Sequence, residues 1–140
     1  MNKTNKTYNL TENQIQEKLD EILKNSYSPY SKARVACLLL FKNGETVCGC
    51  NVENSSYPCC ICAESCAIVC AVASGKNLHD VEKVYIKSNQ KTLFYPCGTC
   101  RQIMSEFLKD ETEIIITTQQ DKGLKDVQTL KNLLPFGFKF

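Results

Sequence analysis

The chain has 140 residues, enough for one domain with a hydrophobic core and too few for two ordinary ones, so we expect a single domain over residues 1–140. Its 17 basic and 15 acidic residues are interspersed and leave a formal charge of +2, which argues against a polynucleotide partner. The first seven residues are polar and no long apolar run follows, so we expect a cytoplasmic protein without a membrane span.

The first half of the chain predicts a helix followed by a β-hairpin. Thr11 to Gln14 has the form of a capping box, and the helical spacing of apolar residues after it predicts a helix from about Glu12 to Lys24. An apolar run from Val35 to Phe41 predicts a strand, and Asn43-Gly44 is typical of a two-residue hairpin turn. The next strand is expected over Glu45 to Val52, so the sheet begins antiparallel.

The second half predicts helices and strands in alternation. In chain order we expect a helix over Cys62–Ser74, a strand over Val81–Ser88, a helix over Gly98–Lys109, a strand over Thr112–Thr118, a turn at Asp121-Lys122-Gly123 and a helix over Val127–Leu134. The helix Cys62–Ser74 is apolar nearly all round, so we expect a second covering surface, which in so small a chain would be another subunit. The alternation implies right-handed crossovers and a mixed sheet with helices on both faces, an α/β fold.

A split cysteine motif is the strongest functional signal. Two segments together offer three thiolates and one free carboxylate to a single metal ion. They are Cys62-Ala63-Glu64 and the later Pro96-Cys97-Gly98-Thr99-Cys100. Structural zinc sites normally have four protein ligands, whereas catalytic sites keep one position open. The pattern therefore predicts a catalytic zinc bound by Cys62, Cys97 and Cys100. Zinc nucleobase deaminases have this arrangement, with the Glu as general acid and base, so we assign proton transfer to Glu64.

Two other interpretations of the cysteines stay open on the sequence alone. A closed, non-catalytic zinc module with four cysteine ligands would have the same spacing, Cys59-x-x-Cys62 with Cys97-x-x-Cys100. Such a site would leave Glu64 without a role. A thioredoxin-like redox motif at Cys97–Cys100 is less favoured, because the dithiol would lie at the wrong point of the chain. Five other cysteines are expected to be small buried hydrophobic residues: Cys37, Cys48, Cys50, Cys66 and Cys70.

Five segments together resemble cytidine deaminase of the small homotetrameric type. They are Tyr30-Ser31-Lys32, Asn51-Val52-Glu53-Asn54-Ser55-Ser56-Tyr57, Cys62-Ala63-Glu64, Pro96-Cys97-Gly98-Thr99-Cys100-Arg101-Gln102 and Leu133-Leu134-Pro135-Phe136-Gly137-Phe138. The resemblance implies a three-layer α/β/α sandwich around a mixed five-stranded sheet. It also implies zinc-dependent hydrolysis of cytidine and deoxycytidine to uridine and deoxyuridine with release of ammonia, a reaction of pyrimidine salvage. A related deaminase acting on blasticidin S is the alternative, and the Asn51–Asn54 segment favours an ordinary nucleoside.

The resemblance also implies roles for individual residues. Asn51 and Glu53 match the residues with which the family holds the ribose hydroxyls, and Ala63 is expected in the same substrate site. A carboxylate that accepts from a hydroxyl discriminates strongly against analogues that lack it. Tyr57 and Phe138 match aromatic residues that one subunit contributes to a neighbour's active site, so the resemblance makes a homotetramer part of the function.

Two positions depart from the family pattern. Ala33 stands where the family usually has a Phe that stacks on the base, so stacking must be weaker or supplied elsewhere. Ser65 stands where an Arg commonly follows the catalytic Glu and donates to the zinc thiolates. A hydroxyl can donate a hydrogen bond but brings no charge. We therefore expect the helix N-termini and Arg101 to offset the negative charge of three thiolates.

Overall fold

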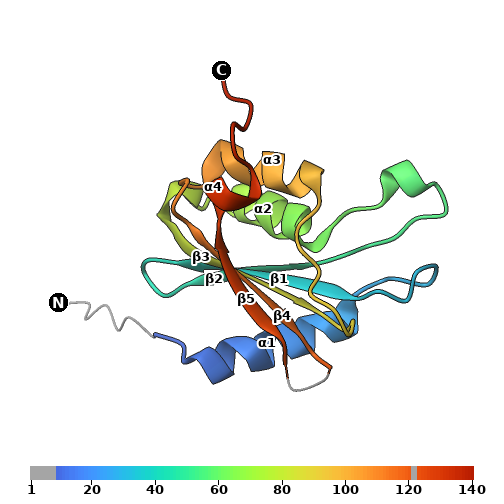
Figure 1. Ribbon diagram of the computed structural model, residues 1–140. Helices are drawn as coiled ribbons and strands as arrows, with labels where there is room; N and C mark the ends of the chain where they lie inside the picture. Colours follow the sequence, from blue (N-terminus) through green and yellow to red (C-terminus); the bar gives the residue numbers. More distant parts are fainter. Residues whose placement is uncertain (1–8, 121–122) are drawn as a thin grey trace.

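The computed structural model describes residues 9–120 and 123–140; residues 1–8 and the first two residues of the predicted turn at Asp121-Lys122-Gly123 lie outside this range. In chain order the elements are α1 (Glu12–Asn25), β1 (Val35–Phe41), β2 (Thr46–Cys50), α2 (Ala63–Ala73), β3 (Val81–Ser88), α3 (Gly98–Phe107), β4 (Glu113–Thr118), β5 (Lys125–Thr129) and α4 (Leu130–Leu133). The five strands form one sheet in the order β2-β1-β3-β4-β5. In Figure 1, α1 covers one face, and α2, α3 and α4 cover the other. The expected three-layer α/β/α sandwich with a mixed sheet is confirmed.

Strand directions place two crossovers over one face of the sheet. β1 pairs antiparallel with both β2 and β3, so β2 and β3 run parallel and α2 connects them. β3 and β4 are parallel neighbours connected by α3, and β5 runs antiparallel at the edge. Because both crossovers lie on one face, the N-termini of α2 and α3 begin at the same end of the sheet (Figure 1).

The helix α1 begins where the capping box predicts. The hydroxyl of Thr11 accepts from the backbone N–H of Gln14 at 3.2 Å, and the side chain of Gln14 accepts from the N–H of Thr11 at 2.8 Å. The buried side chains of Ile15, Leu19 and Leu23 then pack against one face of the sheet. Each fully buried side chain of this kind contributes about 1.5–3 kcal/mol to the free energy of unfolding.

A glycine sets how closely α2 lies on the sheet. Gly49 in β2 is buried, and a Cβ added there would lie 2.6 Å from the carbonyl oxygen of Ala63 and 2.9 Å from the Cα of Ala67, both in the backbone of α2. Only a residue without a side chain permits this approach. The close contact positions the first turn of α2, which carries the candidate catalytic residues.

The C-terminal segment corrects the predicted helix over Val127–Leu134. Residues 125–129 form the edge strand β5, where Val127 pairs with Ile115 of β4, and only Leu130–Leu133 is helical. The apolar spacing satisfies a helix locally, but the open edge of β4 offers a ladder of backbone hydrogen bonds that a helix would leave unpaired. The hydroxyl of Thr129 accepts from the N–H of Asn132 at 3.2 Å and begins the shortened helix.

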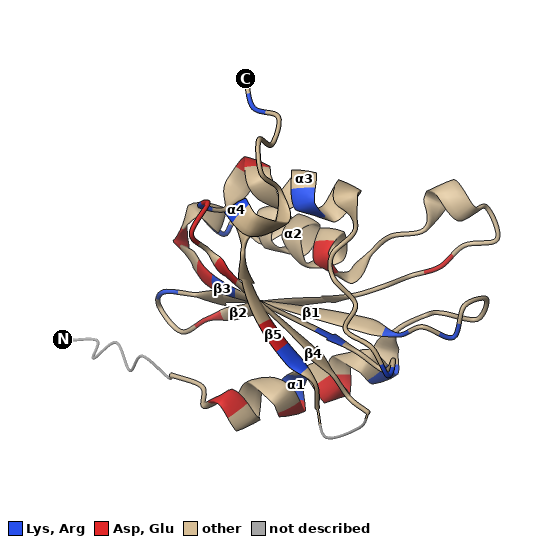
Figure 2. Cartoon of the chain, in the orientation of Figure 1, with Lys and Arg blue, Asp and Glu red and all other residues tan. Residues whose placement is uncertain are grey.

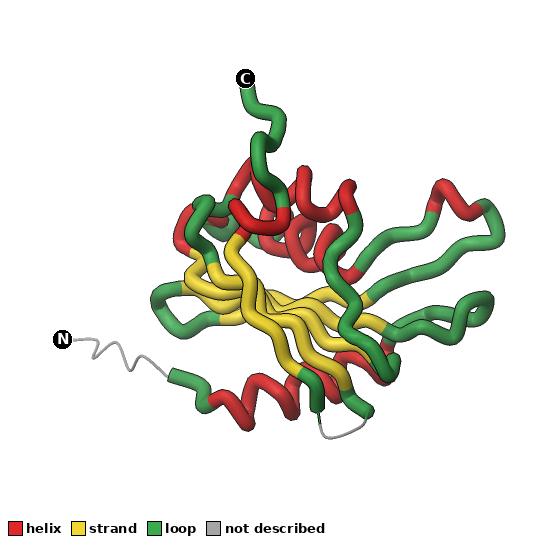
Figure 3. The backbone as a smooth tube through the Cα atoms, in the orientation of Figure 1, coloured by secondary structure: helices red, strands yellow, loops and turns green. Residues whose placement is uncertain are grey.

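Two of the segments that project beyond the sandwich are the loop between β2 and α2 and the chain after α4 (Figure 3). Lys and Arg residues are interspersed with Asp and Glu over helices and sheet in Figure 2. No helix in residues 9–120 and 123–140 combines the length and apolar character that crossing a membrane requires.

Candidate metal centre and substrate pocket

The three predicted cysteine ligands converge. Cys62 is the N-cap of α2, Cys97 is the N-cap of α3, and Cys100 lies in the first turn of α3. Their three sulfur atoms all lie within 4.8 Å of one another, and the Cys62 and Cys97 sulfurs are 3.9 Å apart. Two sulfurs bound to one tetrahedral zinc at 2.3 Å would be about 3.8 Å apart, so the separation fits a single zinc ion.

The cluster that could hold a metal ion contains three cysteines rather than four. In the part of the chain that the structure describes, the metal-ligand cluster contains Cys62, Cys97 and Cys100, and Cys59 is not a member. The closed four-cysteine arrangement is therefore not formed. A three-cysteine set leaves one tetrahedral position open, which is the arrangement of a catalytic zinc.

Helix N-termini favour thiolates at this point, whereas burial and neighbouring negative charge oppose them. The N-termini of α2 and α3 carry partial positive charge, which stabilises anions. The backbone N–H of Cys100 donates to the sulfur of Cys97 at 3.5 Å. A hydrogen bond with Cys62, burial and the charge of Glu64 together raise the pKa of the Cys100 thiol above its ordinary value. Three thiolates beside the Glu64 carboxylate would repel one another, and a bound divalent cation would offset their negative charge.

Glu64 is buried beside the sulfurs. Its side chain is only 5% exposed, and the thiol of Cys100 donates to its Oε2 atom at 3.7 Å. Burial raises the pKa of the Glu64 carboxyl above its ordinary value. A buried carboxyl with a raised pKa next to a metal centre is typical of residues that exchange protons with a substrate.

Ser65 and Arg101 have different contacts around the centre. The Ser65 hydroxyl lies 3.5 Å from the sulfur of Cys100, the contact expected of a residue that supports a thiolate ligand. The Arg101 guanidinium donates to the backbone carbonyls of Pro96 and Leu133, each at 2.7 Å. It thus ties the residue before Cys97 to α4. The predicted role of Arg101 in offsetting thiolate charge stays a prediction.

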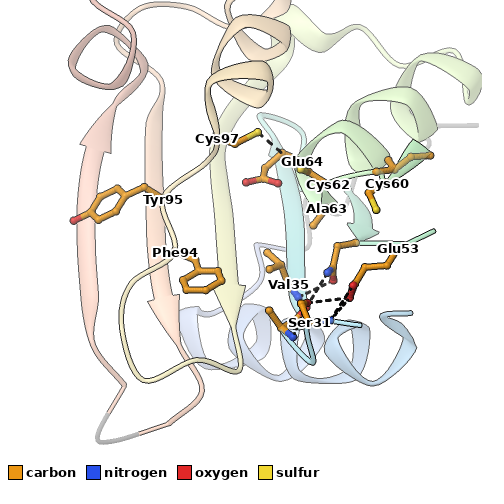
Figure 4. Close-up of a pocket in the computed structure, with 13 residues that line it drawn as sticks. Ser31, Val35, Glu53, Cys60, Cys62, Ala63, Glu64, Phe94, Tyr95 and Cys97 are labelled. Atoms are coloured by element: carbon orange, nitrogen blue, oxygen red, sulfur yellow. Dashed lines mark hydrogen bonds between the residues drawn. The ribbon is translucent and has the colours of Figure 1, made fainter. Parts of the chain in front are cut away.

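A pocket of about 250 Å³ connects the metal centre with polar residues of the segment that follows β2. Figure 4 shows Glu64, Cys62 and Cys97 at one end and Glu53 at the other. Asn51 also lines the pocket, where its side chain accepts from the backbone N–H of Val35. The remaining lining residues are mostly apolar: Ser31, Ala33, Val35, Cys60, Ile61, Ala63, Phe94 and Tyr95. The pocket therefore has a reactive end, an apolar middle and a hydrogen-bonding end.

The polar end is held by hydrogen bonds within the chain. The Asn51 amide accepts from the N–H of Val35 at 2.9 Å and donates to the carbonyl of Ala33 at 2.8 Å. Glu53 accepts from the backbone N–H of Ser31 at 3.0 Å and from the Ser31 hydroxyl at 2.9 Å. These contacts orient both side chains and leave carboxylate lone pairs for the hydroxyl groups of a ligand.

Sequence reasoning missed several residues that line the pocket. Phe94 and Tyr95 are among them, and their position directly before Pro96-Cys97 was the signal available to find them. Tyr57, predicted to reach a neighbour's active site, packs in its own chain against Tyr30 with ring centroids 6.2 Å apart, and Phe138, predicted to do the same, packs against Phe140 at 5.3 Å; the shared role of both stays a prediction. Neither lines the pocket of its own chain.

Comparisons with known proteins agree with this site. Residues 11–117, more than half of the chain, match the family model described as the cytidine and deoxycytidylate deaminase zinc-binding region. The chain is 39% identical over 126 residues to a cytidine deaminase of Mycoplasma pneumoniae, covering 89% of this chain and 92% of that protein. It is 35% identical over 117 residues to a cytidine deaminase of Halalkalibacterium halodurans, covering 82% of this chain and 84% of that protein.

Solved structures show the same relationship. The fold is similar to the crystal structure of cytidine deaminase from Burkholderia pseudomallei, with a TM-score of 0.85, 32% identity and coverage of 92% of this chain and 100% of that chain. It is also similar to cytidine deaminase from Mycobacterium leprae, with a TM-score of 0.72, 32% identity and coverage of 91% and 99%. The family model, the sequence relatives and the fold all agree with the resemblance seen in the sequence, and the chain belongs to the cytidine deaminase family.

Proposed function

We propose that this protein is a zinc-dependent cytidine deaminase that hydrolyses cytidine and deoxycytidine to uridine and deoxyuridine and releases ammonia. One observation carries the proposal: a single pocket has Glu64 beside three converging cysteine sulfurs at one end and Asn51 and Glu53 at the other. The separation of the two ends suits a ligand with a reactive base and a hydroxyl-bearing sugar. The names of the relatives, all cytidine deaminases, support the same substrate class.

The donor set fits zinc, and Cys62, Cys97 and Cys100 would hold it. When bound, zinc supplies an activated water as the nucleophile. Glu64 takes a proton from that water and delivers it to the ring nitrogen of the base, and the water oxygen bonds to the amino-bearing ring carbon. Glu64 would then take the proton of the newly added hydroxyl group and pass it to the amino group, so that the carbon–nitrogen bond breaks, a carbonyl forms, and ammonia leaves with uridine or deoxyuridine as the other product. Asn51 and Glu53 orient the ribose, which keeps the ring carbon beside Glu64.

We place the enzyme in cytoplasmic pyrimidine salvage as a homotetramer. The outer face of α2 supports the oligomer, because Val69 and Val72 are 58% and 52% exposed on a helix whose other side is already buried. Tyr57 and Phe138 are also exposed, on two segments that project beyond the sandwich, and would reach a neighbouring subunit. Light scattering at micromolar concentration should give a tetramer; a fully active monomer would contradict this proposal.

An ammonia-release assay with the zinc-loaded protein tests the activity. Cytidine and deoxycytidine should be deaminated, and cytosine, adenosine and blasticidin S should not. Activity on blasticidin S alone would instead favour the antibiotic deaminase.

The variant Glu64→Gln tests the mechanism. It should retain zinc and the fold while turnover falls by about 10²–10⁴, the contribution of general acid–base catalysis. Glu106→Gln is the matched control, because Glu106 is exposed on α3 and outside the pocket. Unchanged turnover of Glu64→Gln at saturating cytidine would contradict the assigned role.

A further inference from the structure

The segment between β3 and α3 holds one aromatic ring at the pocket. Leu93 packs against the hydrophobic core and Pro96 is fully buried, so both ends of this short stretch are anchored. The hydroxyl of Tyr95 donates to the carboxylate of Asp126 on β5 at 2.6 Å, which directs that hydroxyl away from the metal centre. Figure 4 shows the two rings pointing in different directions, with Phe94 on the side of Val35.

Phe94 is the aromatic residue of this chain that lines the pocket without having its ring tied elsewhere. Ala33 and Ala63 present only methyl groups, Val35 and Ile61 present branched aliphatic side chains, and the Tyr95 ring is held by its hydrogen bond to Asp126. Phe94 is 38% exposed and lines the same pocket. A partly exposed phenyl ring beside a ligand cavity is a stacking surface for a nucleobase, because every base has a π-face.

We infer that Phe94 is the residue on which the pyrimidine ring of the substrate stacks, and that it provides the aromatic contact that Ala33 cannot provide. This inference rests on the proposed function and makes Phe94 a substrate-binding residue. Glu64 and the sulfurs define where the reacting carbon lies, and Asn51 and Glu53 define where the sugar lies. The ring of Phe94 therefore determines how strongly a planar base is preferred over a puckered one.

Binding of two unreactive ligands tests the role of Phe94 directly. Uridine has a planar aromatic base, whereas 5,6-dihydrouridine has the same sugar and carbonyl groups on a puckered, saturated ring. Titration calorimetry on the zinc-loaded protein should show that Phe94→Ala weakens uridine binding about 5- to 150-fold, which corresponds to ~1–3 kcal/mol at 1.4 kcal/mol per tenfold. Binding of 5,6-dihydrouridine should change much less, so the preference for uridine is lost.

Further variants separate stacking from folding. Phe94→Leu keeps most of the apolar volume without the π-face and should also lose the preference for uridine. Ala33→Phe in the Phe94→Ala background adds an aromatic ring from another residue that lines the pocket, and it should restore part of the preference for uridine. The control Leu124→Ala removes a side chain of similar exposure, 47%, that does not line the pocket, and should leave both affinities unchanged.

The inference and the proposed function fail in different ways. If the parent protein releases ammonia from cytidine but Phe94→Ala keeps the parent's ratio of uridine to dihydrouridine affinity, Phe94 does not stack on the base and the inference is wrong. If Phe94→Leu retains the full preference, apolar volume rather than aromaticity explains it, and the inference is again wrong. A parent protein that releases no ammonia from cytidine contradicts the proposed function itself.

Discussion

The contact between Gly49 and α2 predicts that one methyl group will disturb both the fold and the metal centre. A Cβ at this position in β2 would lie 2.6 Å from the carbonyl oxygen of Ala63, whereas ordinary van der Waals contacts of a Cβ begin at 3.4 Å. The atoms in the way belong to the helix backbone, so no side chain can rotate aside. Relief requires α2 to move away from the sheet by at least about 0.8 Å, the difference of these two distances, because the backbone nitrogen of Ala67 would lie closer still.

This displacement has a stability cost and a catalytic cost. Overpacking of a core by one methyl group lowers the free energy of unfolding by about 1–3 kcal/mol. For a domain of this size that is a fall of about 4–12 °C in the melting temperature, at about 4 °C per kcal/mol. The same movement shifts Cys62 and Glu64, which lie at the start of α2. A misplacement of about 1 Å can reduce turnover by about 10²-fold.

Calorimetry measures the melting temperature of Gly49→Ala, and ammonia release measures its turnover. The variant and the parent protein are compared at the same zinc and protein concentrations. Gly98→Ala is the control, because a Cβ at Gly98 in α3 would meet no atom within 4 Å. In the helix it should keep or raise the melting temperature, since Ala exceeds Gly in helix propensity. A Gly49→Ala variant with the parent's melting temperature and turnover would refute the argument that close backbone contact positions the site.

Arg101 and Tyr85 give two further predictions. Arg101→Ala should weaken zinc retention about 10–100-fold in competition with a chromogenic chelator. Arg101→Lys should not restore zinc retention, because one ammonium group cannot reproduce the two guanidinium hydrogen bonds that join the carbonyls of Pro96 and Leu133. Unchanged zinc retention in Arg101→Ala would contradict the proposal that Arg101 supports the metal centre. Burial and a hydrogen bond to Glu12 raise the pKa of Tyr85 from 10.0 to about 12, so its contribution to stability is complete below pH 10 and is lost as the pH rises towards 12. Denaturant titrations should therefore show the parent losing stability over this pH interval faster than Tyr85→Phe, and parallel pH profiles would contradict the assignment.

The sequence by itself was sufficient where the chemistry is local. The capping box at Thr11 and Gln14 is completed within four residues, so α1 begins where predicted. The cysteine spacing predicted the ligand set because each ligand is the N-cap or lies in the first turn of a helix, and helix starts can be found from sequence. The same reasoning identified Glu64, two residues after Cys62, as the buried carboxyl beside the sulfurs.

Tertiary structure decided the features that depend on distant partners. Val127 has a helical spacing to the apolar residues Leu130 and Leu134, and only the free edge of β4 makes residues 127–129 part of a strand. The carboxylate of Glu53 is oriented by Ser31, 22 residues earlier, and Tyr95, next to Phe94 at the pocket, is bonded to Asp126 on β5. Periodicity and spacing describe neighbours along the chain, whereas these contacts form only when the sheet brings separate segments together. The free energy of those long-range contacts outweighs the local preference of each segment.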